Sequence, residues 1–445
     1  MFELEGDVFS IFLPGSRRSR ARNIVADKPQ NKTHTHDNLR FYTSKTEALY
    51  FVFQPTVGAP VDEITTWLNG GPGELSLESF FQGNGDFVWG YGQYAPTINP
   101  YAWVNLTNVL WVEQPVGTGF SIGEVTATNE TDAVKDFNSF FLNFLQTFGI
   151  KNFKIFLTGE SYAGRYVPHF SSAMIDRKRP VYFNVSGALM YDPCIGSYVW
   201  EQNHGPIVPF AVKDKKVLER NASFLTQLQA RDKTSAFVAP NPCFNIPEIS
   251  SQCPLRSDSL GYPTGLQYLY PGQPIYSNRT DMKKTTNAPL GIGWLECKGP
   301  GDTSPDPIQS VLPRVIGATN RVLISNGDLD MSIIADGTLL AIPNMCWGGE
   351  PDFQSQPNTS IVITLLDLQY AATFEANNGL MWAQTYLSGH MEVQSKPRSS
   401  YRHLQWLLGH IEMLQRNANL HLTWPDHILI NITKEVEESS VDEYP

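Results

Sequence analysis

Residues 153–164 read Phe-Lys-Ile-Phe-Leu-Thr-Gly-Glu-Ser-Tyr-Ala-Gly. The first half is apolar and β-prone, and the serine at position 161 has a small residue two positions away on either side. This order predicts a nucleophile elbow: a buried strand enters a sharp, strained turn, and a helix then points its N-terminus at the reacting group. The pattern departs from G-x-S-x-G, because Ala163 takes the last position and Gly164 follows it. Taken alone, the motif is also compatible with an ordinary strand-to-helix turn.

A second buried strand, residues 64–68, runs into Asn-Gly-Gly-Pro-Gly at residues 69–73. Glycines let backbone N–H groups approach a ligand without interference from Cβ. In an α/β-hydrolase such a loop supplies half of an oxyanion hole, and the residue after the nucleophile supplies the other half. The alternative for this loop is a glycine-rich turn without a catalytic role.

The order of elements around these motifs predicts a parallel sheet. Residues 39–53 indicate a β-hairpin, and residues 109–112 form a continuous apolar run followed by a glycine-rich loop at 113–121. Residues 132–148 carry an aromatic stripe at helical spacing, which predicts a core helix that Gly149 ends. Strand, helix, strand and elbow together predict an α/β-hydrolase fold, with a mostly parallel central sheet and helices on both faces.

Changes in amino-acid composition divide the chain into five parts. Residues 1–37 are irregular, and residues 38–183 form the first part of the core. Residues 184–313 are rich in Pro, Gly, Asn, Tyr and Cys, which predicts a cap insertion over the active site. Residues 314–432 complete the core, and residues 433–445 form an acidic tail.

Composition limits the classes of partner. The chain has 445 residues, of which 41% are hydrophobic and 12% aromatic, so it can bury a large core as one domain with insertions or as two domains. A formal charge of −11 argues against nucleic acid as a partner. No run of 18 apolar residues is present, so the sequence predicts no membrane span.

Many N-glycosylation sequons indicate a glycoprotein. They lie at eight positions: Asn31, Asn105, Asn129, Asn184, Asn221, Asn278, Asn358 and Asn431. Three of the first seven residues are acidic, where a signal peptide needs a basic segment and an apolar core. We therefore expect a secreted, vacuolar or lysosome-like protein whose leader is missing from this sequence.

The cysteines give a partial disulfide prediction. There are five, at Cys194, Cys243, Cys253, Cys297 and Cys346, and an odd number leaves at least one thiol unpaired within the chain. Cys243 and Cys253 form the best local pair, and Cys194 with Cys297 is a looser possibility. No Cys or His spacing is typical of zinc, so no metal is expected.

Ser161, Asp330 and His390 follow one another in the chain order of an α/β-hydrolase triad. A serine hydroxyl needs an imidazole to take its proton, and the imidazole needs a carboxylate to fix its tautomer. Asp330 is preferred to Asp328, which stands closer to the preceding strand and could instead cap the turn. Among the histidines, His390 follows a glycine turn after strand-like sequence.

Five ordered motifs resemble the serine carboxypeptidases, and the fungal members most closely. They are Trp-Leu-Asn-Gly-Gly-Pro-Gly at 67–73, residues 113–121, Gly-Glu-Ser-Tyr-Ala-Gly at 159–164, Gly-Asp-Leu-Asp at 327–330 and Gly-His-Met at 389–391. The resemblance extends from about residue 35 to residue 420. It implies the same triad, Gly71 and Tyr162 as oxyanion-hole donors, and Asn69 and Glu160 as the grip on the C-terminal carboxylate of a peptide. It implies no cofactor.

Three positions depart from the pattern of the family. Glu-Leu-Ser at residues 74–76 replaces Cys-Ser-Ser, Gly83 stands where a glutamate helps to hold the terminal carboxylate, and Glu392-Val393 replaces Val-Pro. These changes reduce the number of side chains expected to hold the terminal carboxylate of the substrate but leave the triad intact.

The sequence thus predicts a serine-type carboxypeptidase that releases C-terminal amino acids through an acyl-enzyme on Ser161. Glu160 and the substrate carboxylate cannot both stay ionised when they face one another, so acidic pH should favour binding. An acyltransferase or a general esterase with the same triad is an alternative. A non-catalytic binding glycoprotein built on this fold is another.

Overall fold

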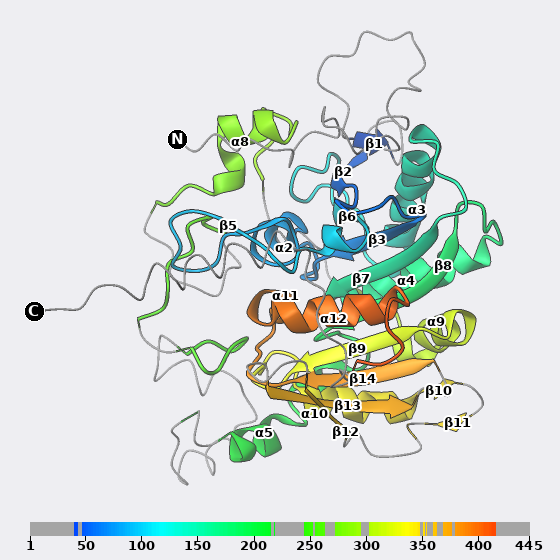
Figure 1. Cartoon of the computed structure of the whole chain (residues 1–445), viewed down its shortest axis with the longest axis vertical. Coiled ribbons are helices and arrows are strands. Elements are labelled where there is room, and N and C mark those ends of the chain that lie inside the picture. Colours follow the sequence, from blue (N-terminus) through cyan, green and yellow to red (C-terminus); the bar gives the residue numbers. More distant parts are fainter. Residues whose placement is uncertain are drawn as a thin grey trace, which may run out of the picture.

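The structure is a computed structural model, and it describes most of the chain between residues 40 and 414 (Figure 1). The described ranges are 40–42, 47–214, 218, 244–251, 254–262, 272–294, 302–347, 350–351, 353, 359–362, 368–375 and 379–414. The irregular segment 1–37 and the tail 433–445 lie outside them. So do Cys243, Cys253, Cys297 and four of the sequons, Asn31, Asn221, Asn358 and Asn431.

Within the described residues, ten strands form one sheet in the order β1-β2-β6-β3-β7-β8-β9-β14-β13-β12. The six central strands, β6 to β14 in this order, are parallel, and the strands at both edges are antiparallel. Their bounds are β1 Arg40–Tyr42, β2 Ala48–Gln54, β3 Glu63–Leu68, β6 Asn108–Glu113, β7 Lys154–Glu160, β8 Asn184–Tyr191, β9 Val322–Gly327, β12 Thr359–Val362, β13 Leu368–Glu375 and β14 Leu380–Thr385. Two short ribbons lie outside the sheet: β4 Phe87–Val88 with β5 Thr97–Ile98, and β10 Cys346–Trp347 with β11 Glu350–Pro351.

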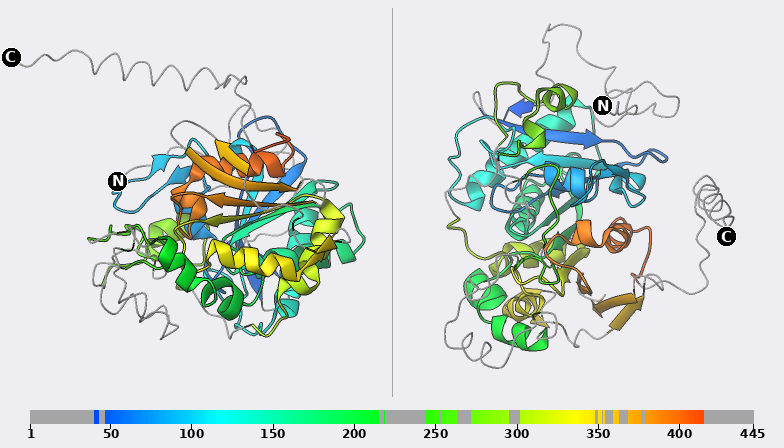
Figure 2. Two further views of the ribbon diagram at one scale, coloured as in Figure 1. Left: turned by 90° about the horizontal axis from the view of Figure 1, so that it is seen from below. Right: turned by 90° about the vertical axis from the view of Figure 1, so that its left-hand side faces the viewer.

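Helices cover both faces of the sheet (Figures 1 and 2). On one face α4 packs against β7 and β8 with α3 and α9 against it, and α3 also contacts β1 and β2. On the other face α12 lies over β8 and β9 and continues from α11, which contacts α2. The bounds are α2 Leu77–Gln82, α3 Glu130–Thr147, α4 Ala163–Asp176, α5 Ile207–Lys213, α8 Thr280–Thr285, α9 Val311–Thr319, α10 Ala335–Ala341, α11 Glu392–Ser395 and α12 Pro397–Leu407. This architecture is the α/β-hydrolase arrangement that the motif order predicts.

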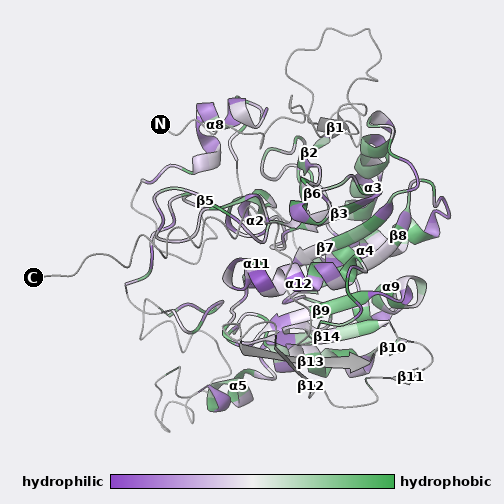
Figure 3. Ribbon diagram, viewed as in Figure 1, coloured by the Kyte–Doolittle hydropathy of each residue, from purple (hydrophilic) through white to green (hydrophobic). Residues whose placement is uncertain are grey.

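The aromatic stripe of α3 is part of the core, as predicted. Phe137, Phe140, Phe141 and Phe144 are each at most 1% exposed, and the Phe137 ring stacks on Phe170 of α4 with centroids 4.4 Å apart. The same apolar character runs through the central strands, which are green in Figure 3. Burial of these rings fixes α3 and α4 against the sheet, and α4 in turn begins at the elbow.

Local signals set the ends of α3. The side chain of Asn129 accepts a hydrogen bond from the Asp132 amide, which is an N-cap, so the helix starts two residues before the predicted Asp132. After the last turn Gly149 adopts φ +67°, the left-handed conformation that glycine takes at low cost. The predicted stop at Gly149 is confirmed.

Some predicted boundaries need correction. Residues 184–191 form β8 inside the sheet, paired with β7 and β9, so the segment outside the sheet begins after Tyr191 rather than at residue 184. The last helix of the described residues, α12, covers Pro397–Leu407. Cys194 is a free, buried thiol, so its pairing with Cys297 is wrong; Cys346 is also free.

In the part of the chain that the structure describes, no helix combines the length and apolar composition required to cross a membrane.

Candidate active site

Ser161 stands in a strained turn between β7 and α4. Its φ is +63°, a conformation that non-glycine residues adopt only when the surrounding structure holds them there. Its amide donates to Tyr191 O at 2.9 Å and its carbonyl accepts from Cys194 N at 3.0 Å, which ties the turn to the end of β8. A Cβ built on Gly159 would collide with Leu68 O and would lie 2.6 Å from Ala163 Cβ. The turn therefore requires the small residues from which it was predicted.

Asp330 and His390 form a direct hydrogen-bonded pair. Asp330 follows β9, and His390 follows the neighbouring parallel strand β14, so both stand at the carboxyl edge of the sheet. His390 Nδ1 lies 2.7 Å from Asp330 Oδ2. Asp330 is fully buried and also accepts hydrogen bonds from the amides of Ser332 at 2.7 Å and Ile333 at 3.2 Å. These donors orient the carboxylate toward the imidazole.

Asp328, the rejected alternative, has a different position. Its carboxylate accepts a hydrogen bond from the Ser388 amide at 3.3 Å, in the turn before His390. Burial raises the pKa of Asp328 to about 6. Asp328 thus braces the turn, and the imidazole contact belongs to Asp330.

The charges around His390 favour its cationic form. Burial alone would lower the pKa of His390, but the charge of Asp330 and the hydrogen bond to it, with smaller contributions from Glu160 and Glu74, raise the pKa to about 9. Glu160 directly precedes Ser161 and is close enough to His390 for this interaction. The three predicted triad residues thus stand at one edge of the sheet, and the structure gives a direct contact between two of them.

The glycine-rich loop lies directly against the elbow. A Cβ built on Gly70 would lie 2.5 Å from Tyr162 N and 2.7 Å from Ser161 Cβ. Gly71 has φ +106°, which favours glycine, and the Glu74 amide closes the loop on Gly70 O at 3.1 Å. The loop therefore brings its own backbone next to the amide of Tyr162, as the prediction of Gly71 and Tyr162 as oxyanion-hole donors requires.

The two residues predicted to grip a carboxylate are both buried. Asn69 Oδ1 accepts from Trp67 Nε1 at 2.5 Å, and its Nδ2 donates to Glu78 Oε2 at 3.4 Å. Burial, together with the nearby charges of Glu74 and others, raises the pKa of Glu160 to about 8 although His390 opposes this. The raised pKa favours the protonated form of Glu160, which can donate a hydrogen bond.

Sequence reasoning missed Asp192, which directly follows β8. It is fully buried, and its Oδ1 accepts from the Gly327 amide at 2.9 Å. One carboxylate oxygen of Asp192, one of Asp330 and one ring nitrogen of His390 all lie within 4.8 Å of one another. Burial and the neighbouring charge of Asp330 raise the pKa of Asp192 well above its usual range. Asp192 follows β8, which lies between β7 and β9 in the sheet, and this position at the carboxyl end of a parallel strand was the signal that could have identified it.

Glu392, noted as a departure from the family pattern, is buried under the site. It accepts hydrogen bonds from Ser325 Oγ at 2.7 Å and Thr385 Oγ1 at 2.5 Å, and it lies 3.8 Å from His403 Nδ1. Burial raises the pKa of Glu392 to about 7. The substitution thus connects β9, β14 and α12 through polar contacts beneath the pair formed by Asp330 and His390.

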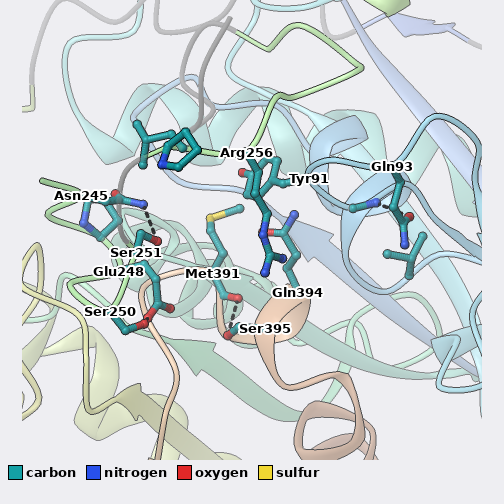
Figure 4. Close-up of a pocket in the computed structure, with 15 residues that line it drawn as sticks. Tyr91, Gln93, Asn245, Glu248, Ser250, Ser251, Arg256, Met391, Gln394 and Ser395 are labelled. Carbon is teal, nitrogen blue, oxygen red and sulfur yellow. Dashed lines mark hydrogen bonds between the residues drawn. The ribbon is translucent and has the colours of Figure 1, made fainter. Parts of the chain in front are cut away.

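A cavity of about 660 Å³ is lined in part by Met391, the residue after His390 (Figure 4). Its walls come from the loop after β4, from residues 245–256, and from Met391 with α11. Most lining side chains are polar, including Gln93, Glu248, Arg256 and Gln394. Met391 directly follows His390, so the cavity contacts the turn that carries the imidazole.

Comparisons with known proteins identify the family of the chain. The serine carboxypeptidase family matches residues 25–410. Serine-type carboxypeptidase F of Aspergillus niger is 48% identical over 435 residues, covering 82% of each chain, and a probable serine carboxypeptidase of Arthroderma benhamiae is 37% identical over 432 residues, covering 83% of this chain and 81% of the relative. The crystal structure of Kex1Δp, a prohormone-processing carboxypeptidase from Saccharomyces cerevisiae, has the same fold, with a TM-score of 0.62 at 20% identity over 87% of this chain and 91% of that chain. The chain therefore belongs to the serine carboxypeptidase family and is a serine-type carboxypeptidase with an α/β-hydrolase fold.

Proposed function

We propose that Ser161, His390 and Asp330 act as nucleophile, general base and orienting acid. His390 takes the hydroxyl proton while Ser161 Oγ attacks the last peptide carbonyl, and the same proton then passes to the leaving amine of the C-terminal residue. Water activated by His390 hydrolyses the acyl-enzyme and releases the shortened peptide, so no cofactor is needed. The 2.7 Å contact between His390 Nδ1 and Asp330 Oδ2 is the observation that carries this assignment.

The negative charge of the tetrahedral intermediate needs donors that are in place before the reaction. We assign this role to the backbone N–H groups of Gly71 and Tyr162. The close packing of Gly70 on Tyr162 N supports the assignment, because it holds both segments rigidly together. Donors fixed in this way cost no reorganisation when charge develops.

Recognition of the free C-terminus is assigned to Asn69 and Glu160. With a pKa raised to about 8, Glu160 carries a proton at acidic and neutral pH and can share it with the substrate carboxylate. In this protonated form Glu160 no longer contributes to the raised pKa of His390, which leaves the imidazole better able to accept a proton. Protonated Glu160 therefore favours binding of the free C-terminus at acidic and neutral pH.

The test is a pH-resolved assay of one peptide against its C-terminal amide. We expect the free acid to be cleaved with a much lower KM at pH 5, and the preference to decline as the pH passes about 8. Equal KM values for acid and amide at every pH would exclude the role given to Asn69 and Glu160.

Acyl transfer or ester hydrolysis is the second candidate, and Gly83 is the observation that favours it. A Cβ at Gly83 would lie 3.1 Å from Ser79 O, so the position expected to hold a glutamate offers little room for one. The neighbouring Gln82 is engaged with Asp258 Oδ1 at 3.0 Å. Incubation with acyl esters and an alcohol or amine acceptor, ranked against release of amino acid from blocked dipeptides, separates transferase, esterase and peptidase.

We also propose that the protein works outside the cytosol, in a secreted or vacuolar setting. Among the sequons in the described residues, the Asn105 side chain is exposed, whereas Asn129, Asn184 and Asn278 are partly buried. Asn278 is also bonded to Trp294 through both ends of its amide. Enzymatic deglycosylation and peptide mapping should find a glycan at Asn105 and should find Asn278 bare.

A further inference from the structure

A short segment between β8 and α9, residues 246–249, connects the two loops that carry Asp330 and His390. We call it the strap. The Met331 amide donates to its first carbonyl at 3.0 Å, and its last amide donates to Leu329 O at 3.2 Å. Between these two bonds, the His390 amide donates to Pro247 O at 2.7 Å. The strap is therefore hydrogen-bonded both to the loop that carries Asp330 and to the loop that carries His390.

Apolar packing anchors the strap on the acid side. Ile249 is 4% exposed and belongs to the same buried cluster as Leu329 and Met331, the residues on either side of Asp330. Ile246 packs on this cluster as well. Removing the strap from this position would therefore expose apolar surface next to the acid.

Side-chain contacts anchor the strap on the histidine side. The Gly389 amide donates a hydrogen bond to the Glu248 carboxylate, and the Ser250 hydroxyl donates to it as well. A Cβ built on Gly389 would collide with Pro247 O and Glu248 Oε2. The histidine turn is thus in tight contact with the strap, and Glu248 holds the residue next to His390.

The other side of the strap faces the cavity. Pro247 and Glu248 line it together with Asn245, Ser251, Met391 and Gln394, and Figure 4 shows the Glu248 side chain beside that of Ser250. A substrate side chain that fills the cavity therefore presses on the same segment that holds His390.

We propose that the strap is a positioning element for the Asp330–His390 pair and that Glu248 is its positioning residue. Glu248 acts through Gly389 and not by touching the reacting atoms, and it keeps the imidazole aligned with Ser161 while the substrate occupies the cavity. This inference rests on the roles proposed for Asp330 and His390. Since small errors in the alignment of a general base reduce turnover more than binding, the effect belongs mainly to kcat.

The test compares Glu248→Ala with Glu248→Gln, which keeps an acceptor for the Gly389 amide. We expect Glu248→Ala to lower kcat about tenfold with KM within about twofold of the parent, and Glu248→Gln to recover kcat to within about threefold. The matched control is Glu201→Ala: Glu201 also accepts a backbone amide, that of Ser197 at 2.7 Å, but has no contact with the strap. It should leave kcat unchanged.

A second readout is the rate at which a fluorophosphonate labels Ser161. This reaction needs neither a peptide nor its carboxylate, so it separates failure of this inference from failure of the proposed peptide recognition. Labelling of Glu248→Ala should slow about tenfold at an unchanged melting temperature. If Glu248→Ala keeps kcat and the labelling rate, or if Glu248→Gln is as impaired as Glu248→Ala, the strap does not position His390 through this hydrogen bond. Should Glu248→Ala fail to fold, an unrecovered Glu248→Gln overturns the proposal by itself.

Discussion

The two halves of the active site are held in place by different physics. On the nucleophile side, the Ser161 turn is held by two backbone hydrogen bonds and by steric contact: Gly70 and Gly159 lie so close to neighbouring backbone that no side chain fits. On the acid–base side, Asp330 and His390 are fixed by hydrogen bonds, from backbone amides, from the strap and from each other. A larger side chain at Gly70 or Gly159 should therefore impair the nucleophile side, whereas loss of a polar or charged group should impair the acid–base side.

The largest effect is expected from Asp330→Asn. An asparagine would keep an acceptor but would present the wrong hydrogen-bonding pattern to His390 Nδ1, which disfavours the tautomer that can act as base. We expect kcat to fall about 10⁴-fold with little change in KM, as in other Ser-His-Asp enzymes. Steady-state kinetics on a peptide measures this.

Asp328→Asn is the matched control, two residues away in the same loop. Because Asp328 braces Ser388 and does not contact the imidazole, its kcat should fall by less than about tenfold. A larger loss in Asp328→Asn than in Asp330→Asn would reverse the assignment of the acid.

The steric half is tested by Gly70→Ala. The new methyl group would meet Tyr162 N at 2.5 Å and Glu160 O at 2.7 Å, and both are backbone atoms that cannot rotate away. We expect a loss of about 3 kcal/mol in the free energy of unfolding, with loss of fluorophosphonate labelling. Denaturant unfolding of Gly70→Ala and Gly317→Ala side by side measures it.

Gly317 is a suitable control because it lies inside α9 with open space around its Cβ position. There, alanine should stabilise the protein by up to about 1 kcal/mol through helix propensity. Equal destabilisation of both variants would show that the loop at Gly70 is no more constrained than a helix surface.

The raised pKa of Glu160 predicts a pH effect on substrate binding that Glu160→Gln should remove. In the parent protein the pKa of Glu160 is raised to about 8, so the donor to the substrate carboxylate is lost above that pH and KM for the free acid should rise by up to about tenfold per further pH unit. Glutamine donates at every pH, so KM of the variant should not rise in this way. Measuring KM from pH 5 to pH 10 checks it, and a rise that persists in Glu160→Gln would assign it to another group.

The same contrast explains what could be predicted from the sequence. Steric requirements appear as small residues at fixed spacing, so the elbow, the glycine loop and the aromatic stripe of α3 were all predictable. Asp192 and Glu248 were not, because the contacts that give them a place come from segments far away in the chain. The predicted start of the insertion was wrong because the first half of β8 resembles the polar sequence after it. Pairing with β7 places β8 in the sheet and buries its second half.

The smallest expected effect concerns Asp192, where charge should matter for stability and little for turnover. Asparagine has the same shape and can accept the Gly327 amide in the same way. The folded-state pKa of Asp192 is raised, so between the unfolded pKa and the folded pKa, folding requires this group to take up a proton, and its contribution to stability declines as pH rises. Asp192→Asn should therefore melt about 2 °C higher than the parent at pH 7 but at the same temperature at pH 3, with kcat within about twofold. Thermal melts at both pH values measure the difference, and a shift that is equal at pH 3 and pH 7 would mean that packing, not the buried carboxyl proton, distinguishes the two side chains.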